Sequence, residues 1–516
     1  MTPRVQYALV FAGAALVAGF SIRRGIDPFD EGLALHAAAR VGDGQLPYAD
    51  FTWAYGPGQP YLIAALNELF SPSLIAWRIV RVLVDAAVAT LVYALVCRHA
   101  PRWLAVVGAL IAACAMAQPL SANPFPIALL AGLGALAVIT VEPHSPRRAA
   151  AAGALCGVAA AWRLDFGLYA AAAVAVAILL RPAPGRERAR AAAWAAGGAV
   201  AVGLLAYGPF LVAAGPADLW DALVATSLRD RDYWTLPFDW TYDGGLELWP
   251  PSALAADGKD LLDHYLPVVL WAAAASALAA AAFAWRRAGT APWRWLAVLA
   301  FAAGAALYLS SRTDAFHETP LIVALAVLLP WLVAWGLRER LHAAAAMAGV
   351  ALALVAAAGV ADRVSALFDP PRLEPLDLAI ADGVRARPVD AAALPAVVET
   401  IHAEVPPGEP IYVAPRRSDL ARIGNPLLYV MADRPNALRD DFPLLARRSV
   451  HDDVVEALAD ARPRIVVRWT DPESSRREPN LRGEPSGYRA LDELLASDYE
   501  RLRAFGHYEV LRLRDG

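Results

Sequence analysis

The stretch VQYALVFAGAALVAGFSIRRGIDPFDEG (5–32) ends with two adjacent carboxylates, Asp30 and Glu31, that closely follow an apolar segment. Residues 5–22 carry no charge, which is typical of a membrane span. The simplest interpretation of the acidic pair is helix punctuation, because Asp27 can cap a helix and acidic groups suit its first turn. The remainder of the chain favours a functional interpretation.

The composition indicates a polytopic membrane protein. Of 516 residues, 58% are hydrophobic and 19% are charged, and the apolar residues fall in long blocks before about residue 361. The formal net charge of −4 offers no basic surface, so no nucleic-acid partner is expected. The cysteines lie in or beside apolar blocks, with neither a disulfide framework nor zinc-ligand spacing.

The apolar blocks predict about 11 transmembrane helices, the first of which is a retained signal anchor. They cover approximately residues 5–22, 73–97, 103–119, 125–141, 149–163, 165–181, 191–214, 264–285, 293–310, 320–337 and 342–361.

The loops between these spans fit one orientation, in which the N-terminus is cytoplasmic. The loops then placed inside are short and rich in arginine, as in RPAPGRERAR (181–190), which the positive-inside rule favours. The opposite loops are longer, and in loop 215–263 acidic residues outnumber basic ones. An odd number of spans places the C-terminus outside.

The predicted domains follow from a change of character after residue 361. Residues 1–361 form the transmembrane domain, with outer loops at 23–72 and 215–263, and the Pro-rich region 362–388 is a linker. Residues 389–516 form an extracytoplasmic α/β domain. Its strand-like runs are EPIYVAP (409–415), PRIVVRW (463–469) and HYEVLRLR (507–514), and VHDDVVEALADAR (450–462) is helical.

Charged residues gather on the predicted outer face of the bundle. Besides the acidic pair, they come from two short reversals between spans, WRLDFGLY (162–169) and SRTDAFHE (311–318). The two hairpins hold six charged or titratable groups, more than they need for solvation: Arg163, Asp165, Arg312, Asp314, His317 and Glu318. Together with Asp30 and Glu31, they form the charged set on this face.

The second span carries three further charges, Arg78, Arg81 and Asp85, on one helical face. Charges within a span are costly, so they mark either a functional site or an internal ion pair that joins helices. Both interpretations remain open for Arg81 and Asp85. A carboxylate can deprotonate a hydroxyl nucleophile, and arginines can hold a phosphate leaving group. These parts suit transfer from a lipid phosphate at the outer surface.

One segment resembles the first outer loop of membrane glycosyltransferases of the GT-C fold. It is DEGLALHAAARVGDGQLPYADFTWAYGPGQPYL (30–62). The resemblance is to the bacterial branch related to protein O-mannosyltransferases and the lipid A aminoarabinose transferase. Its elements are the Asp-Glu pair, a Gly-x-x-Pro-Tyr-x-Asp-Phe stretch and a Tyr-Gly-Pro-Gly turn. WRLDFGLY (162–169) and SRTDAFHETPL (311–321) resemble two further motifs of that branch.

This resemblance implies a multi-pass protein of the bacterial inner membrane that transfers a monosaccharide from a polyprenyl-phosphate donor to an envelope acceptor, without a cofactor. It implies that Asp30 is the general base of an inverting reaction and that Glu31 orients the acceptor. Donor-phosphate candidates are Arg163, Arg312 and His317, with Arg78 and Arg81 behind them. Candidate substrate contacts are Tyr55, Asp50, Asp165 and Asp314.

Other interpretations remain. Tyr55 could belong to an aromatic belt at the membrane interface as well as to a sugar platform. No metal is expected. The Asp-x-Asp pair of Asp230 and Asp232 has the spacing of metal ligands, but its flanking arginines are typical of loop charges. A transporter or flippase of lipid-linked sugars is the alternative function, although charges at the outer ends of spans and the lack of an internal repeat disfavour it. The hypothesis of a structural envelope protein does not explain why the charged residues gather on one predicted side of the membrane.

Overall fold

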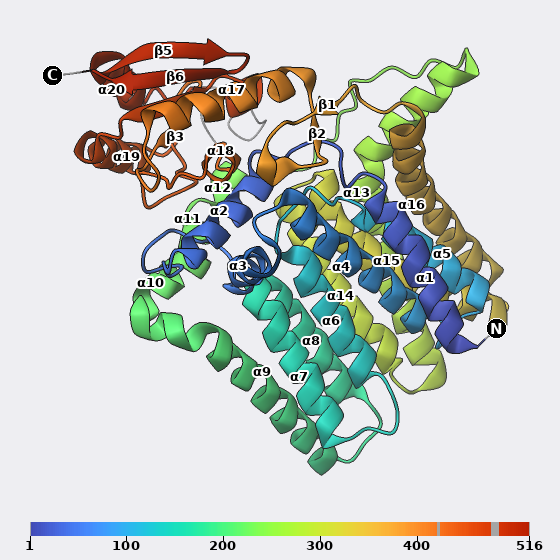
Figure 1. Cartoon of the computed structure of the whole chain (residues 1–516). Coiled ribbons are helices and arrows are strands. Elements are labelled where there is room, and N and C mark those ends of the chain that lie inside the picture. The colour runs from blue at the N-terminus through green and yellow to red at the C-terminus, as the bar shows by residue number, and fades with distance from the viewer. Residues whose placement is uncertain (1, 421–423, 476–484, 515–516) are drawn as a thin grey trace.

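The computed structural model describes residues 2–420, 424–475 and 485–514. A bundle of helices carries a smaller α/β domain on one end, and the N-terminus lies toward the opposite end (Figure 1). The predicted fold class, a polytopic helical protein with a C-terminal α/β domain, is confirmed.

Each predicted span coincides with a helix of the bundle. These helices are α1 (Pro3–Gly19), α4 (Leu74–Val96), α5 (Arg102–Met116), α6 (Phe125–Ile139), α7 (Pro146–Trp162), α8 (Leu164–Leu180), α9 (Gly185–Ala213), α13 (Pro251–Ala288), α14 (Trp293–Ser311), α15 (Ala315–Arg338) and α16 (His342–Phe368).

Length and apolar composition divide these helices into groups. Among the described residues, α4, α9, α13, α14, α15 and α16 are long and apolar enough to cross a membrane, whereas α5, α6 and α8 are apolar but shorter. The most apolar part of α15 is 89% buried and that of α9 only 11% buried. Helix α15 is therefore the core of the bundle, and α9 presents an apolar surface that a bilayer can cover. The number of crossings and their orientation stay predictions.

Small residues bring the bundle helices into close contact. A Cβ atom at Gly153 of α7 would lie 1.8 Å from the carbonyl oxygen of Ala195 on α9. One at Gly198 of α9 would lie 2.2 Å from the carbonyl oxygen of Ala150. Glycine at these positions lets the two backbones touch, which is how membrane helices gain packing energy without a hydrophobic driving force between them.

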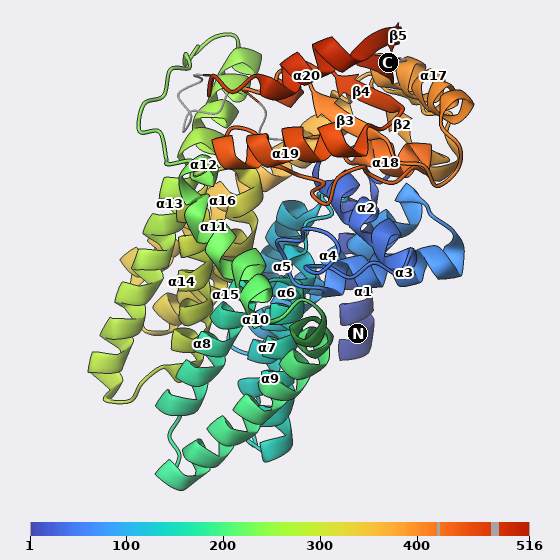
Figure 2. The same ribbon diagram turned by 90° about the vertical axis from the view of Figure 1, so that its left-hand side faces the viewer.

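Short helices fill the space between the bundle and the C-terminal domain (Figure 2). The first outer loop contains α2 (Asp30–Gly42) and α3 (Gly58–Phe70). The second contains α10 (Pro216–Trp220), a π-helical turn (Asp221–Ala225), α11 (Thr226–Arg229) and α12 (Arg231–Trp234), which lead from the end of α9 up to the C-terminal domain.

The Tyr-Gly-Pro-Gly turn fixes the first outer loop on the end of α7. Gly56 donates its backbone N–H to the carbonyl of Trp162 at 3.1 Å, and a Cβ at Gly56 would lie 2.2 Å from the carbonyl oxygen of Ala161. A Cβ at Gly58 would lie 2.6 Å from the Trp162 ring. Both glycines are therefore needed for close approach to the reversal that carries Arg163.

The C-terminal domain is built on a four-stranded sheet with the order β3-β4-β6-β5. Strands β3 and β4 are parallel, and the other neighbours are antiparallel. Its strands are β3 (Tyr412–Pro415), β4 (Ile465–Trp469), β5 (Tyr499–Phe505) and β6 (Tyr508–Leu513), and its helices are α17 (Pro388–Glu404), α18 (Leu427–Ala432), α19 (Arg448–Ala461) and α20 (Ala490–Asp498).

The three predicted strand runs correspond to β3, β4 and β6, whereas β5 was missed. Strand β5 is a largely exposed edge strand, and a register shift between Arg501 and Arg503 interrupts its alternation. An exposed, bulged edge gives a weak sequence signal. In the predicted linker region, the two-residue strands β1 (Glu374–Pro375) and β2 (Arg385–Ala386) pair with each other, and Arg385 also pairs with Arg24 beside the first outer loop.

We expect Gly56→Ala to destabilise the protein by about 2 kcal/mol, because the added methyl group overlaps the backbone of α7. Thermal unfolding of the detergent-solubilised protein, followed by tryptophan fluorescence, measures this loss. Gly203→Ala in α9 is the matched control, since a Cβ there meets no atom within 4 Å. Equal stability of the two variants would contradict the proposed contact.

Candidate active site

Asp30 opens the first turn of α2 and is half-buried. The chain is turned into this helix by Asp27, whose Oδ1 accepts the backbone N–H groups of Phe29 (3.0 Å) and Asp30 (3.2 Å). Asp27 thus closes the turn that leads into α2, whereas the N-cap position is occupied by Phe29, which makes no side-chain capping hydrogen bond. The carboxyl group of Asp30 lies within reach of the charges of Arg163, Arg81 and Asp314.

Glu31 points away from that space into a buried ion pair with Arg78 of α4. The guanidinium donates from Nε to Oε1 and from Nη2 to Oε2, both at 2.7 Å, and both side chains are fully buried. Its remaining donors reach the carbonyls of Ile22 (2.9 Å) and Gly25 (3.1 Å). This pair joins α2 to α4 of the bundle, and each side chain is engaged within the protein.

Arg81 is engaged in the same way within the bundle. Its Nε donates to Asp85 at 2.8 Å, and its Nη groups donate to the carbonyls of Ser121 and Met116. The internal ion pair, one of the two interpretations left open by the sequence, is what the structure shows. Arg81 thereby holds the segment between α5 and α6 at the outer end of the bundle, next to Asp30.

The first reversal, between α7 and α8, presents Arg163. Its guanidinium grips Asp165 with two bonds (Nε–Oδ1 3.0 Å, Nη2–Oδ2 2.7 Å) and reaches Asn123 and the Tyr308 hydroxyl, both at 3.3 Å. Its carbon Cζ also lies 5.3 Å from the centre of the Tyr55 ring. The extended backbone at Arg163 breaks the helix here and directs the side chain into the gathering of polar groups.

The second reversal, between α14 and α15, repeats this Arg-x-Asp arrangement. Arg312 donates from Nε to Asp314 at 2.6 Å and from Nη1 to the carbonyl of Trp234 at 3.3 Å. Asp314 caps α15 by accepting the backbone N–H of His317 at 3.0 Å, and it also contacts the Nδ1 atom of that ring at 2.7 Å.

Tyr308 connects the two reversals. Its hydroxyl accepts from Arg163, and its ring stacks on that of His317 with centroids 4.4 Å apart. The charges of Arg163, Arg81 and Asp314 all act on Asp30. The structure therefore brings together Asp30, Tyr55, Arg163, Asp165, Arg312, Asp314 and His317, with Glu31, Arg78 and Arg81 packed behind as supporting pairs.

Tyr55 and Asp50, two of the predicted substrate contacts, lie in different surroundings, one half-buried near Arg163 and the other exposed. Tyr55 is beside Arg163, and burial raises the pKa of its hydroxyl. Asp50 is exposed and accepts the backbone N–H of Leu46 at 2.7 Å, so its observed task is to close a turn.

The protonation chemistry of the site is set by burial. Burial raises the pKa of Asp30 to about 6, against the opposing charge of Arg163 and the polar side chain of Ser121. Burial, together with the charges of Asp30 and Glu31, raises the pKa of Asp27 to about 8. Both carboxyls therefore titrate closer to neutral pH than a free aspartate, the range in which a carboxylate can accept a proton from a hydroxyl group.

Sequence reasoning missed Ser121, Asn123 and Tyr308. Each is an uncharged polar residue at or just outside the predicted outer end of an apolar helix, which is the signal that could have identified them. Within the described residues, no group of three or more His, Cys, Asp or Glu side chains is arranged to hold a metal ion. Asp230 is buried and accepts from Arg447 of the C-terminal domain at 2.9 Å.

The chain is similar in structure to ArnT from Cupriavidus metallidurans, both in the apo state and bound to undecaprenyl phosphate. In each case the TM-score is 0.55 at 14% sequence identity, covering 99% of this chain and 98% of that chain. It is also similar to the arabinofuranosyltransferase AftD from Mycobacteria, with a TM-score of 0.53 and 17% identity over 100% of this chain and 42% of that chain. No protein-family model and no curated protein matches the sequence.

The architecture is thus that of GT-C membrane glycosyltransferases, and the fold implied by the sequence resemblance is confirmed. The likeness to ArnT extends over nearly the whole of both chains, so it includes the C-terminal domain as well as the bundle.

We expect Arg78→Met to lower the free energy of unfolding by about 3–5 kcal/mol, because it leaves the buried Glu31 carboxylate without its cation. The double variant Glu31→Gln/Arg78→Met removes both charges and should regain most of that loss. Thermal unfolding in detergent compares the three proteins. A double variant as unstable as Arg78→Met would show that the pair is not what holds α2 to α4.

Proposed function

We propose that the chain is an integral-membrane glycosyltransferase that moves a monosaccharide from a polyprenyl-phosphate donor to an acceptor hydroxyl. The observation that carries the proposal is the meeting of Asp30 with two arginine-bearing reversals at one end of a bundle with the GT-C fold. This transfer requires a base that deprotonates the acceptor hydroxyl and cations that bind the donor phosphate.

Arg163 and Arg312 are the proposed ligands of the donor phosphate, with His317 beside them. In the donor, the phosphate is a diester and carries one negative charge. Cleavage of its bond to the sugar turns it into a monoester, which carries a second negative charge. Two nearby guanidinium groups therefore stabilise the transition state more than the bound donor, which is the condition for catalysis. ArnT has been solved with undecaprenyl phosphate, which supports a polyprenyl phosphate as donor carrier here.

Asp30 is the proposed general base. It takes the proton of the acceptor hydroxyl as that oxygen attacks the anomeric carbon, and the bond from this carbon to the phosphate oxygen breaks. The leaving phosphate keeps the electron pair. Attack from the side opposite the phosphate inverts the anomeric centre.

The remaining predicted residues receive supporting tasks in this proposal. Glu31 and Arg78 hold α2, and Arg81 holds the segment that carries Ser121. Asp165 and Asp314 orient Arg163 and Arg312 in the free protein. When the donor binds, its phosphate replaces some of these hydrogen bonds.

We place the reaction on the extracytoplasmic face of a bacterial inner membrane. Support comes from the arginine-rich loops at the end of the bundle away from the site, which the positive-inside rule puts in the cytoplasm. The C-terminal domain then lies outside the cell, on the same side as the site.

Binding of undecaprenyl phosphate to the detergent-solubilised protein tests the donor site. We expect Arg163→Ala and Arg312→Ala each to weaken binding at least tenfold, since each removes a charge-assisted contact to the phosphate. Arg190→Ala, an exposed arginine of α9 at the other end of the bundle, is the matched control. Equal affinity of all four proteins would contradict the placement of the phosphate.

Transfer activity tests the base. With a panel of radiolabelled undecaprenyl-phosphate hexoses and pentoses and a crude envelope extract, we expect Asp30→Asn to lower kcat by about 10²–10⁴-fold. Asp43→Asn, at the exposed far end of α2, should be unaffected. Donor binding without sugar transfer by the wild-type protein would instead favour a flippase.

The pH dependence follows from the pKa of Asp30. Because a general base must be ionised, kcat/KM should rise with pH through about 6 and reach a plateau above it. The charge of Arg163 lowers the pKa of Asp30, so Arg163→Gln should move this limb to higher pH, whatever the loss in absolute rate. A profile that is flat from pH 5 to pH 8 would argue against Asp30 as the base.

A further inference from the structure

The C-terminal domain contacts α2 on both sides of Asp30. Leu427, at the start of α18, donates its backbone N–H to the carbonyl of Pro28 at 3.3 Å. Its backbone also packs so tightly on Gly32 that a Cβ there would lie 2.2 Å from the Leu427 nitrogen. The residues flanking Asp30 in sequence are therefore in direct contact with the backbone of the C-terminal domain.

Asp441 makes a second attachment, farther along the same helix. Its carboxylate is fully buried, with Oδ2 2.9 Å from Nδ1 of His36 and Oδ1 2.8 Å from Nη2 of Arg40. Asn436 also donates to Oδ1 at 2.8 Å, and Arg40 donates to the carbonyl of Leu438 at 2.6 Å. His36 and Arg40 lie one helical turn apart, so one carboxylate grips two successive turns of α2.

The neighbouring ring of Phe442 extends this attachment to both outer loops. It lies 4.4 Å, between ring centroids, from Phe29, the residue just before Asp30. On its other side it lies 5.3 Å from Trp234 of the second outer loop. A single segment of the C-terminal domain thus contacts both loops that border the site.

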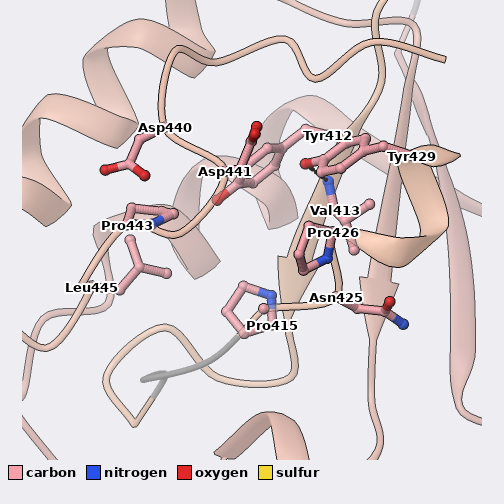
Figure 3. Close-up of a pocket in the computed structure, with 11 residues that line it drawn as sticks. Tyr412, Val413, Pro415, Asn425, Pro426, Tyr429, Asp440, Asp441, Pro443 and Leu445 are labelled. Atoms are coloured by element: carbon pink, nitrogen blue, oxygen red, sulfur yellow. Dashed lines mark hydrogen bonds between the residues drawn. The ribbon is translucent and has the colours of Figure 1, made fainter. Parts of the chain in front are cut away.

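Asp441 and Tyr429 line a small pocket of the C-terminal domain, and Tyr429 stacks on His36 with ring centroids 4.7 Å apart. Asp440 lines the same pocket, but its side chain points in a different direction (Figure 3). It accepts the backbone N–H of Phe442 at 2.8 Å, and among the described residues it makes no hydrogen bond or ion pair with α2, although the charge of Arg40 counters the rise in its pKa that burial causes. The chain therefore provides a neighbouring carboxylate for comparison.

Helix α2 packs against α3 and α18, and eight of its 13 residues are buried. Its buried ionic links are the Glu31–Arg78 pair at the first turn and the Asp441 contacts with His36 and Arg40 farther along. Loss of the second link frees the far part of this helix, which extends about 20 Å, to shift against the C-terminal domain. Displacement of a catalytic group by about 1 Å costs about 100-fold in rate.

Resting on the function proposed above, we propose that Asp441 is a positioning residue of the transfer reaction. It holds α2 through His36 and Arg40, and this second attachment fixes the place of Asp30 relative to the donor phosphate. The C-terminal domain is then a working part of the site.

The test compares Asp441→Asn with Asp440→Asn in the full-length protein. We expect Asp441→Asn to lower kcat for transfer at least tenfold, while the affinity for undecaprenyl phosphate stays within twofold, since Arg163 and Arg312 belong to the bundle. Asp440→Asn should leave both quantities unchanged. Arg40→Gln should lower kcat in the same direction, and adding it to Asp441→Asn should cause little further loss, because both substitutions break one contact.

Hydrogen exchange of residues 30–42, read by mass spectrometry, measures the same attachment without any activity. We expect faster exchange in Asp441→Asn and Arg40→Gln than in the wild-type protein or Asp440→Asn. Unchanged exchange of α2 would overturn the attachment. Faster exchange with an unchanged kcat would overturn the positioning role. If the wild-type protein transfers no sugar, the exchange measurement still decides the attachment, and the proposed function alone fails.

Discussion

The buried ion pair between Glu31 and Arg78 is the interaction on which the site depends. Two ions removed from water are tolerated only when their hydrogen bonds are satisfied, and here every guanidinium nitrogen donates to Glu31 or to the carbonyl of Ile22 or Gly25. The pair sets where α2 leaves the bundle. The position of Asp30, the course of the loop toward the Tyr-Gly-Pro-Gly turn and the surface offered to the C-terminal domain all follow from that junction.

The sequence was informative wherever one physical requirement dominates. A long apolar run can satisfy its backbone in a bilayer only as a helix, and each predicted span is one. The gathering of charges at one end of the bundle was also predictable, because a charge within the apolar part of a span is costly. Their partners were not: Arg163 with Asp165, and Arg312 with Asp314, have a spacing that serves a phosphate site or a mutual ion pair equally well. Uncharged Ser121, Asn123 and Tyr308 gave still less signal.

The role of the C-terminal domain could not be inferred from its own sequence. His36 and Arg40 share a helical face, which indicates that the face has a partner but does not identify it. Asp441 lies in an irregular segment between α18 and α19 whose composition is that of any surface loop. Only the folded chain brings these three residues together, because backbone packing at Gly32 and Leu427 sets the register between two distant segments.

Arg40 and Leu438 bond to each other although they lie 398 positions apart in the chain. The helix that bears Asp30 is synthesised before most of the bundle, and the segment of the C-terminal domain that contacts it is synthesised after the bundle. A chain without this segment would carry the arginines and the carboxylate but not the contact. The surroundings of α2 are therefore complete only when the C-terminal domain has folded onto it.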